Sequence, residues 1–302
     1  MENIKKITGS SGMVKSKNTK TTDWIIAAVC MVIILVCILP MINILARSLS
    51  SSMAIVNRRV AFLPVEFTLE AYQNVFSDAA FSRSVLWTVF LTIVCTIVSM
   101  VMTVLCAYPL TYDSLKGRKV INIIIILTMY FSAGTIPNYI LMKDLNLLEN
   151  PLVLIIPSCL SVFNMIILRS FFYGIPESLR ESAELDGANP FTVLVRIYLP
   201  LSTSVLATLS LFYAVGRWNG FSDALMYMTD ARYAPIQLKL FQIINNRAAI
   251  EVAQQEGLAM TMAASEGIKA AAIIIATLPI VCAYPWLQRY FITGVTIGAV
   301  KG

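Results

Sequence analysis

Six long stretches without a single Asp, Glu, Lys or Arg divide this 302-residue chain. About twenty apolar residues at 1.5 Å rise cross the roughly 30 Å hydrocarbon core of a bilayer, and in lipid only a helix satisfies all backbone groups within such a segment. Only 13% of the residues are charged, whereas about a quarter is typical of soluble domains. The pattern predicts an all-α polytopic membrane protein whose transmembrane domain, 23–302, has six transmembrane helices at about 24–46, 84–112, 120–142, 150–168, 199–218 and 270–288.

Lysines before the first stretch indicate the orientation of the chain. Residues 1–22 are polar, contain five lysines and show no apolar period, so they are predicted to form a disordered cytoplasmic tail. The short basic loop 116–119 lies two crossings later and is cytoplasmic by the same rule. Ala46, Arg47 and Ser48 make a poor cleavage site for a signal peptide. We therefore expect an uncleaved multi-pass protein with both termini in the cytoplasm.

The residue types exclude several kinds of site. The chain contains no His, and all six cysteines fall inside the uncharged stretches, where a thiol behaves as a small hydrophobe. Neither a metal site nor a disulfide framework is expected, and the net charge of +6 reflects lysines near a membrane rather than nucleic-acid binding. No GxxxxGK[ST] phosphate loop is present. The chain is therefore not expected to be an enzyme or to hold a cofactor of its own.

Local sequence signals predict a kink in one of the six helices, a short additional helix and a large loop. Gly134, Pro137 and Asn138 predict a kink near the outer end of the third stretch. Leu69, Tyr72, Val75 and Phe76 recur at helical spacing after Thr68, which predicts a short outer helix with Thr68 as its N-cap. The segment 221–268 is predicted to be a large outer loop that meets a partner protein.

The cytoplasmic segment 174–200, GIPESLRESAELDGANPFTVLVRIYLP, predicts two short helices. Apolar residues repeat every four positions in its first half, with charges on the other faces. Gly187 accepts the positive φ of a helix end, and Asn189 followed by Pro190 restarts a helix with an N-cap and a suitable first residue. A bent helical pair on the cytoplasmic surface follows.

This segment resembles the signature of the inner-membrane permeases of ABC importers: Glu, Ala, Ala, three residues, Gly, nine residues, Ile, one residue, Leu, Pro. The matching residues, with Ser182 in place of the first Ala, are Glu181, Ser182, Ala183, Gly187, Ile197, Leu199 and Pro200. Further stretches make the chain similar to carbohydrate importers of the maltose type, closest to the subfamily for complex or uronic-acid oligosaccharides: FTLEAYQNVF (67–76), GTIPNYIL (134–141), GRWNGF (216–221) and PWLQRYFITGVTIGAVKG (285–302).

The resemblance implies a type I ABC importer permease fold in a bacterial cytoplasmic membrane, and alternating access as the mechanism. It implies that 174–200 docks on a cytoplasmic ATPase and that the loop 221–268 meets an external sugar-binding protein. The implied partners are a second homologous permease, two ATPase subunits that hold ATP and Mg, and the binding protein. By the same resemblance the C-terminal residues Val300, Lys301 and Gly302 contact the ATPase.

Aromatic and amide side chains in or near the spans are candidates for the solute path, because sugars pair C–H faces with rings and hydroxyls with amides. They are Tyr130, Asn138, Tyr139, Asn164, Trp218 and Asn219. Each also has a purely structural interpretation, as an interfacial aromatic or an amide bonded to a neighbouring helix.

Other functions are weighed against the importer. An ion-coupled secondary transporter normally carries ionisable residues inside its spans, and the six stretches have none. A membrane enzyme would need a convincing constellation of acids or nucleophiles. A scaffold would not need the fixed spacing of the cytoplasmic signature. An importer for a non-sugar solute stays open as an alternative.

Overall fold

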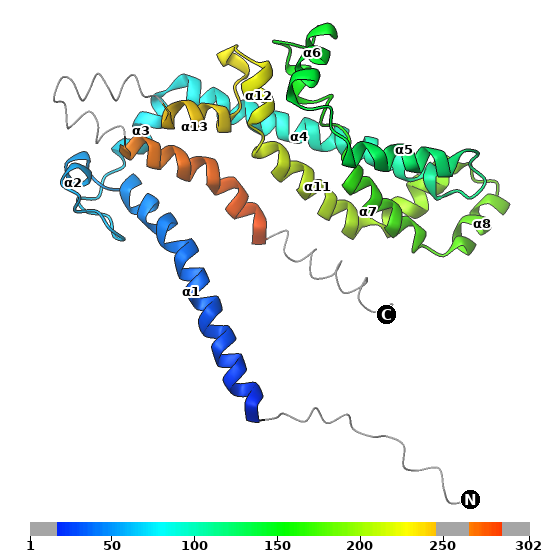
Figure 1. Ribbon diagram of the computed structural model, residues 1–302, viewed down its shortest axis with the longest axis horizontal. Helices are drawn as coiled ribbons and strands as arrows, with labels where there is room; N and C mark the ends of the chain where they lie inside the picture. The colour runs from blue at the N-terminus through cyan, green and yellow to red at the C-terminus, as the bar shows by residue number, and fades with distance from the viewer. Residues whose placement is uncertain (1–16, 246–265, 286–302) are drawn as a thin grey trace, which may run out of the picture.

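The computed structural model describes residues 17–245 and 266–285. Within these ranges three helices are long and apolar enough to cross a membrane, and the number rises to five if each of two bent helix pairs counts as one span. The three are Thr22–Ser48 within α1 (Lys17–Ser48), Ala79–Thr111 around α4 (Ala79–Ala107), and the helix Glu266–Pro285. The first, second and sixth predicted crossings therefore fall on continuous helices (Figure 1).

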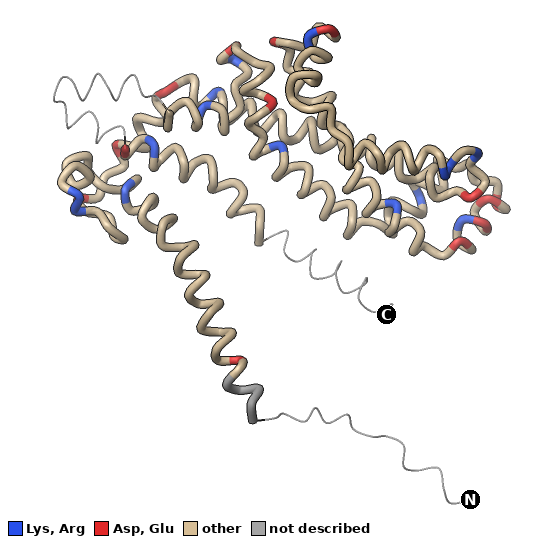
Figure 2. Tube along the Cα trace, viewed as in Figure 1, with Lys and Arg blue, Asp and Glu red and all other residues tan. Residues whose placement is uncertain are grey.

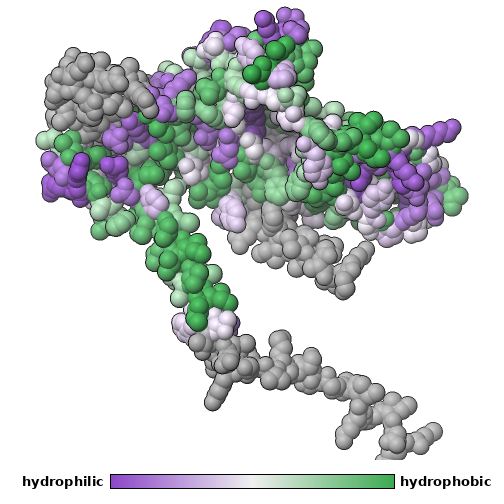
Figure 3. Space-filling model, viewed as in Figure 1, coloured by the Kyte–Doolittle hydropathy of each residue, from purple (hydrophilic) through white to green (hydrophobic). Residues whose placement is uncertain are grey.

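Helix α1 begins before its predicted boundary. The tail was expected to stay irregular to residue 22, but 17–22 form the first turns of this helix. Residues 1–16 lie outside the described residues. Among the described residues, the buried positions of α1 lie near its C-terminal end, at Ala46 and Ser48. Hydrophobic side chains cover the visible surface of this helix (Figure 3).

The third predicted crossing is broken rather than gently kinked. Helix α5 (Arg118–Tyr130) and helix α6 (Thr135–Asp144) meet at 115°. The break lies at Gly134, whose φ of +89° suits glycine. Pro137 lies in the first turn of α6. A backbone N–H at this position would have no acceptor within the helix, so proline is tolerated there. The predicted bend is confirmed, and its cause is Gly134 rather than Pro137.

The fourth predicted crossing, 150–168, is not one helix. A 3₁₀ turn, η2 (Pro151–Leu154), is followed by irregular backbone, and α7 begins only at Val162 and ends at Tyr173. Ser161 caps α7 by accepting a hydrogen bond from the Asn164 N–H at 3.4 Å. Pro151 and Pro157 cannot donate to a helical ladder, so an uncharged run here does not become a span-length helix.

The fifth crossing is also bent. Helix α9 (Pro190–Val193) continues into a π-helical turn, η3 (Leu194–Tyr198), and a short α10 (Leu199–Leu201). Helix α11 (Thr203–Trp218) then leaves at 84°. Pro200 has no N–H for a regular ladder, and π-turns relieve such interruptions by widening the helix.

Helix α4 is the central element, and different segments pack at its two ends. At its C-terminal end Ala107 and Tyr108 share a core with α7, Val193 and Tyr198. At its N-terminal end Phe81 packs with α3 (Glu70–Ser77) and with Ile236 of α13 (Ile236–Ile244). Charged residues lie at these two ends of the bundle, around α8 (Glu177–Leu185) and around α2 (Ser52–Val56), α3 and α13, and also at α6 and α12 (Figure 2).

The helix predicted after Thr68 is present as α3, but its N-cap is one residue later than predicted. Its N-cap is Leu69, and Thr68 lies one residue earlier, where its Oγ1 accepts the Glu70 N–H at 3.2 Å. The predicted outer loop differs more. Its described part forms α12 (Ser222–Tyr227), η4 (Ala231–Tyr233) and α13, and Ile236 is fully buried, with its N–H donating to Thr88 Oγ1 at 2.7 Å. This part of the loop is therefore packed onto α4 rather than free in solvent.

Glu149 fastens the segment after α6 to the outer segment. Its carboxylate accepts the Thr229 hydroxyl at 2.8 Å and the backbone N–H groups of Thr229 and Asp230 at 3.0 and 3.2 Å. The backbone and side-chain hydrogen bonds from Thr229 lower the pKa of Glu149. A carboxyl whose folded pKa is depressed contributes stability above its ordinary value of 4.5, and that contribution is lost as pH falls through the lowered value.

We therefore expect the Thr229 and Asp230 amides to lose hydrogen-exchange protection when the pH falls from 7 to below 4. Protection factors, which correct for the intrinsic pH dependence of exchange, measure this loss. In Glu149→Gln protection should be lower at pH 7 and should change little with pH, because the amide does not titrate in this range. An unchanged pH response in Glu149→Gln would exclude Glu149 as the titrating group.

Candidate functional site

The signature segment 174–200 folds as the sequence predicts locally. Helix α8 ends at Leu185 with Asp186 as C-cap, and Gly187 follows with φ +83°. Asn189 caps α9 by accepting the Thr192 N–H at 2.8 Å, and Pro190 is the first residue of that helix. No other atom lies within 4 Å of a Cβ built on Gly187, so its backbone conformation rather than crowding favours glycine here.

The signature residues divide between an exposed face and a buried face. Glu181, Ser182, Gly187 and Pro200 are exposed, whereas Ala183, Ile197 and Leu199 are partly buried against the core at the C-terminal end of α4. Two large apolar side chains join the exposed face: Leu185 is 90% exposed and Phe191 is 67% exposed. Exposed apolar side chains next to charged ones are typical of a protein-binding surface. We call Glu181, Leu185, Gly187 and Phe191 the docking face.

Arg180 and Tyr108 fasten this helical pair to the membrane helices. The Arg180 side chain is 14% exposed, pairs with Glu177 and with Glu184 at 3.7 Å, and lies 4.7 Å above the centre of the Tyr112 ring. Burial alone would lower the pKa of Arg180, but Glu177 and the other neighbouring groups raise it, so the guanidinium stays charged. The Tyr108 hydroxyl donates to the Pro190 carbonyl at 3.0 Å.

Packed aromatic rings stand behind these contacts. Tyr108 meets Tyr198 at 5.1 Å and Phe172 at 6.3 Å between ring centres, and Phe172 meets Tyr198 at 5.4 Å, all edge-to-face. This geometry is favourable for ring pairs. The rings come from the end of α4, from α7 and from η3, so the cluster joins three segments of the bundle behind α8 and α9.

A second region is a cavity of about 1030 Å³ between α4, the start of α7 and the end of α11. Its walls combine hydroxyls, amides, aromatic rings and one charged pair. The lining residues are Cys95, Ser99, Ser158, Ser161, Phe163, Asn164, Phe212, Tyr213, Val215, Gly216, Arg217, Asn219, Gly220, Phe221, Ser222 and Asp223. The size suits a small-molecule solute.

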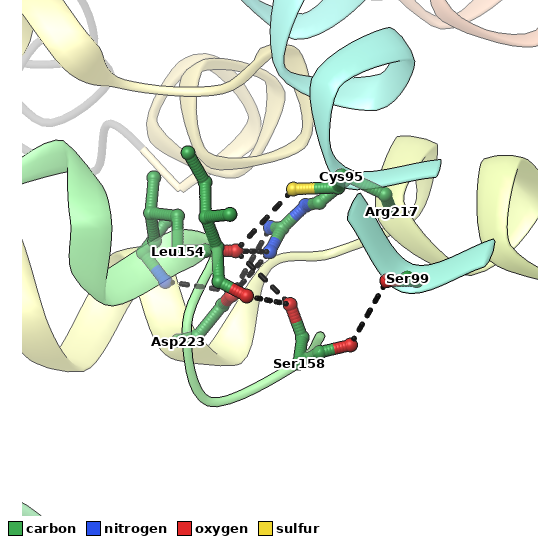
Figure 4. Close-up of polar contacts among 8 residues, drawn as sticks. Cys95, Ser99, Leu154, Ser158, Arg217 and Asp223 are labelled. Atoms are coloured by element: carbon green, nitrogen blue, oxygen red, sulfur yellow. Dashed lines mark hydrogen bonds and ion pairs between the residues drawn. The ribbon is translucent and has the colours of Figure 1, made fainter. Parts of the chain in front are cut away.

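Arg217 and Asp223 form a bidentate ion pair at this cavity. The two guanidinium–carboxylate contacts are 2.5 and 3.1 Å long, and Arg217 also donates to the Leu154 carbonyl at 3.0 Å (Figure 4). The Arg217 side chain is only 6% exposed and that of Asp223 is 29% exposed. The pair ties the end of α11 to η2 and α12, and it leaves no net charge on this wall.

Hydroxyl contacts hold the neighbouring wall. The Ser99 hydroxyl on α4 donates to the backbone carbonyl of Ser158 at 3.3 Å (Figure 4). The Ser158 hydroxyl in turn donates to the carbonyl of Leu154 at 3.1 Å. Tyr213 on α11 accepts the Ser161 N–H at 3.0 Å. The irregular backbone between η2 and α7 is thus satisfied by side chains of α4 and α11, which is required where non-helical backbone lies at membrane depth.

The structure brings two of the six proposed path residues to this cavity. Asn164 and Asn219 line it. Trp218 is buried elsewhere, where its Nε1 donates to the Ala276 carbonyl at 2.9 Å. Tyr130 and Asn138 are exposed on α5 and α6, and Tyr139 stacks on Tyr227 at 6.1 Å. These four residues do not converge with the two asparagines.

Sequence reasoning missed the charged pair and the aromatic wall of the cavity. Arg217 falls near the end of the predicted span 199–218, directly after its uncharged part, and had no predicted role. Asp223 follows six positions later. The proposed contact residues Val300, Lys301 and Gly302 lie outside the described residues, as does 246–265 of the outer loop.

Comparison with known proteins extends over most of the chain. Residues 79–297 match the model of the family described as binding-protein-dependent transport system inner membrane component. The chain is 38% identical to the polygalacturonan/rhamnogalacturonan transport system permease protein YtcP of Bacillus subtilis, over 93% of this chain and 98% of the relative. It is 41% identical to protein LplC of the same organism, over 88% and 90%.

A solved structure agrees with these matches. A chain in the crystal structure of a bacterial ABC transporter involved in the import of the acidic polysaccharide alginate superposes with a TM-score of 0.84. The two chains are 32% identical, and the match covers 91% of this chain and 98% of the other.

Proposed function

Since this chain belongs to the family of binding-protein-dependent transport system inner membrane components, we propose that it is one of two permease subunits of an ATP-driven oligosaccharide importer. The solute crosses the cytoplasmic membrane by alternating access. ATP and Mg are held by two partner ATPase subunits, and this chain hydrolyses no ATP itself. An external sugar-binding protein delivers the solute to the two permeases.

The docking face is the observation that carries this proposal. Leu185 and Phe191 are highly exposed beside Glu181, at the end of the bundle opposite α3 and α13. Apolar anchors of this kind gain most when a partner's pocket removes them from water. Arg180 and the Tyr108 ring cluster connect this face to α4, α7 and η3. Closure of the ATPases against the docking face would therefore move the helices that surround the cavity.

The orientation follows from the same assignment. If the docking face meets cytoplasmic ATPases, then α3 and α13 at the other end of α4 face outward and both termini lie in the cytoplasm. The described part of the outer segment, α12 to α13, is then available to the binding protein. The terminal residues Val300, Lys301 and Gly302 are proposed as a second ATPase contact.

The solute class is proposed from the relatives and from the cavity. Two of the compared proteins are named for polysaccharides, polygalacturonan/rhamnogalacturonan and the acidic polysaccharide alginate. The cavity wall carries hydroxyls, amides and aromatic rings, which suit a hydroxyl-rich solute. We propose an oligosaccharide, with short uronic-acid oligosaccharides as the first to test.

The test is reconstitution of the full assembly in proteoliposomes: both permeases, the ATPases and the binding protein. Wild type should accumulate labelled tri-galacturonate only when ATP is supplied on the ATPase side. Leu185→Asp should reduce uptake at least about tenfold and weaken retention of the ATPase on the permease pair, because a charge replaces an apolar anchor that docking would bury.

A matched control is Leu63→Asp, which changes a 76% exposed leucine in the segment between α2 and α3. It should leave ATPase retention unchanged. Equal ATPase retention in wild type and Leu185→Asp would refute the docking face. Import of a non-sugar solute, with no import of any oligosaccharide, would overturn the proposed solute class.

A further inference from the structure

Asn164 is buried without a partner for its side chain. It is 5% exposed in the first turn of α7 and lines the cavity. Its backbone N–H is satisfied by Ser161, but within the described residues the side-chain amide has no hydrogen bond. Its amide atoms are not among the fully enclosed, unpaired side-chain atoms of the described residues, so they keep access to the cavity. Here the donor and acceptor of Asn164 are available to whatever occupies the cavity.

The residue before Asn164 adds an aromatic ring to the wall of the same cavity. Phe163 is 54% exposed and lines the same cavity. A pyranose ring presents an apolar C–H face and a polar rim of hydroxyls, so a ring and an adjacent amide with both donor and acceptor capacity match its two surfaces. Asn219, on the α11 side, is less available because its amide N–H donates to the Val215 carbonyl at 3.0 Å.

The charges at the cavity argue against carboxylate recognition at this position. Among the described residues that line it, only Arg217 and Asp223 are charged, and they neutralise each other. Arg217 is further held by the Leu154 carbonyl, while Asp223 keeps the greater exposure. A solute carboxylate at this wall would therefore be repelled by Asp223, while the guanidinium of Arg217 is already paired.

We infer that Phe163 and Asn164 form a carbohydrate-binding position of this chain that reads the hydroxyls of one sugar ring and not its carboxylate. This inference rests on the proposed function, because it assigns to one place the recognition of the solute in transit. It makes the chain a direct contributor to solute selection and not only a wall of the path.

The test compares uptake of two probes by the reconstituted assembly, tri-galacturonate and its carboxyl-reduced neutral counterpart. Asn164→Ala should raise the KM for uptake about tenfold, the effect of losing a buried hydrogen bond to the solute. The factor should be the same for both probes when uptake is measured against the concentration of solute-loaded binding protein. Phe163→Ala should act in the same direction.

Thermal melting separates binding from folding. A structural asparagine lowers Tm when it is removed, whereas Asn164→Ala should not lower it, because no internal hydrogen bond is lost. Asn74→Ala, which changes an exposed amide on α3, is the matched control and should leave KM unchanged.

The outcomes keep the two claims distinct. Wild-type import with an unchanged KM in Asn164→Ala overturns the sugar position alone. A larger KM change for the charged probe than for the neutral one overturns hydroxyl-only recognition. Failure of the wild-type assembly to import either probe, or any other oligosaccharide, contradicts the proposed function itself.

Discussion

Gly187→Arg is expected to abolish solute uptake, to below about a hundredth of wild type, while the chain still inserts in the membrane. Gly187 has φ +83°, and a residue with a Cβ is destabilised there by roughly 1–2 kcal/mol. The strain opposes the bend between α8 and α9, and the new side chain adds bulk and positive charge to the docking face, where the partner must fit. Uptake by proteoliposomes containing the full assembly measures the effect, and protease protection of the inserted chain checks insertion.

Two matched variants separate strain from position. Gly117→Arg places the same side chain at another glycine with positive φ, +81°, and open space around it, and should retain much more uptake. Gly187→Asn should also retain uptake, because asparagine tolerates the left-handed region. Glu181→Ala, which removes the exposed carboxylate of the docking face, should abolish uptake as Gly187→Arg does. Normal uptake in both Gly187→Arg and Glu181→Ala would refute the coupling role.

Asp223→Leu is expected to destabilise the folded chain by about 3–5 kcal/mol, since removing one partner leaves a buried charge uncompensated. The stranded charge would be Arg217, whose side chain is 6% exposed. Arg217→Met should be milder, because Asp223 is 29% exposed and can be hydrated. Melting of the purified chain in detergent, followed by tryptophan fluorescence, measures both.

The double variant Arg217→Met with Asp223→Leu should recover most of the lost stability, because buried ion pairs are often replaceable by apolar residues. If the destabilisation of the double variant equalled the sum of the two single effects, the pair would contribute no coupling. The double variant also reports on transport. Recovery of stability without recovery of uptake would show that the pair positions the cavity wall as well as stabilising it.

Capping signals were readable from the sequence because they act over a few residues. Asn189 and Pro190 begin a helix, and Gly187 follows the end of another, by interactions confined to their own turns. The central crossings were not readable in the same way. A count of uncharged residues predicts one helix over 150–168. In the structure Pro157 interrupts this stretch, and the helix begins only at Val162, after the Ser161 N-cap.

The cavity was even less accessible to sequence reasoning. Arg217 is bonded to the carbonyl of Leu154, 63 positions earlier, and no local pattern relates these residues. Asn164 was identified by its residue type alone. Its lack of a side-chain partner depends on how the helices pack. The same packing places Phe163 and the Arg217–Asp223 ion pair in the lining of the same cavity.

Because of the π-turn Leu194–Tyr198, the number of residues between Gly187 and Pro200 matters as much as their identities. A π-turn holds one more residue than an α-turn would, and each residue rotates a helix by about 100°. Deleting one residue within Leu194–Tyr198 would let the turn relax to ordinary α-helical pitch with its two flanks still in register. Deleting one residue between Pro190 and Val193 would instead rotate the start of α9 by about 100° relative to Ile197 and Leu199, which pack against the core. The number of residues on each side of the turn is therefore itself a constraint on which variants can assemble.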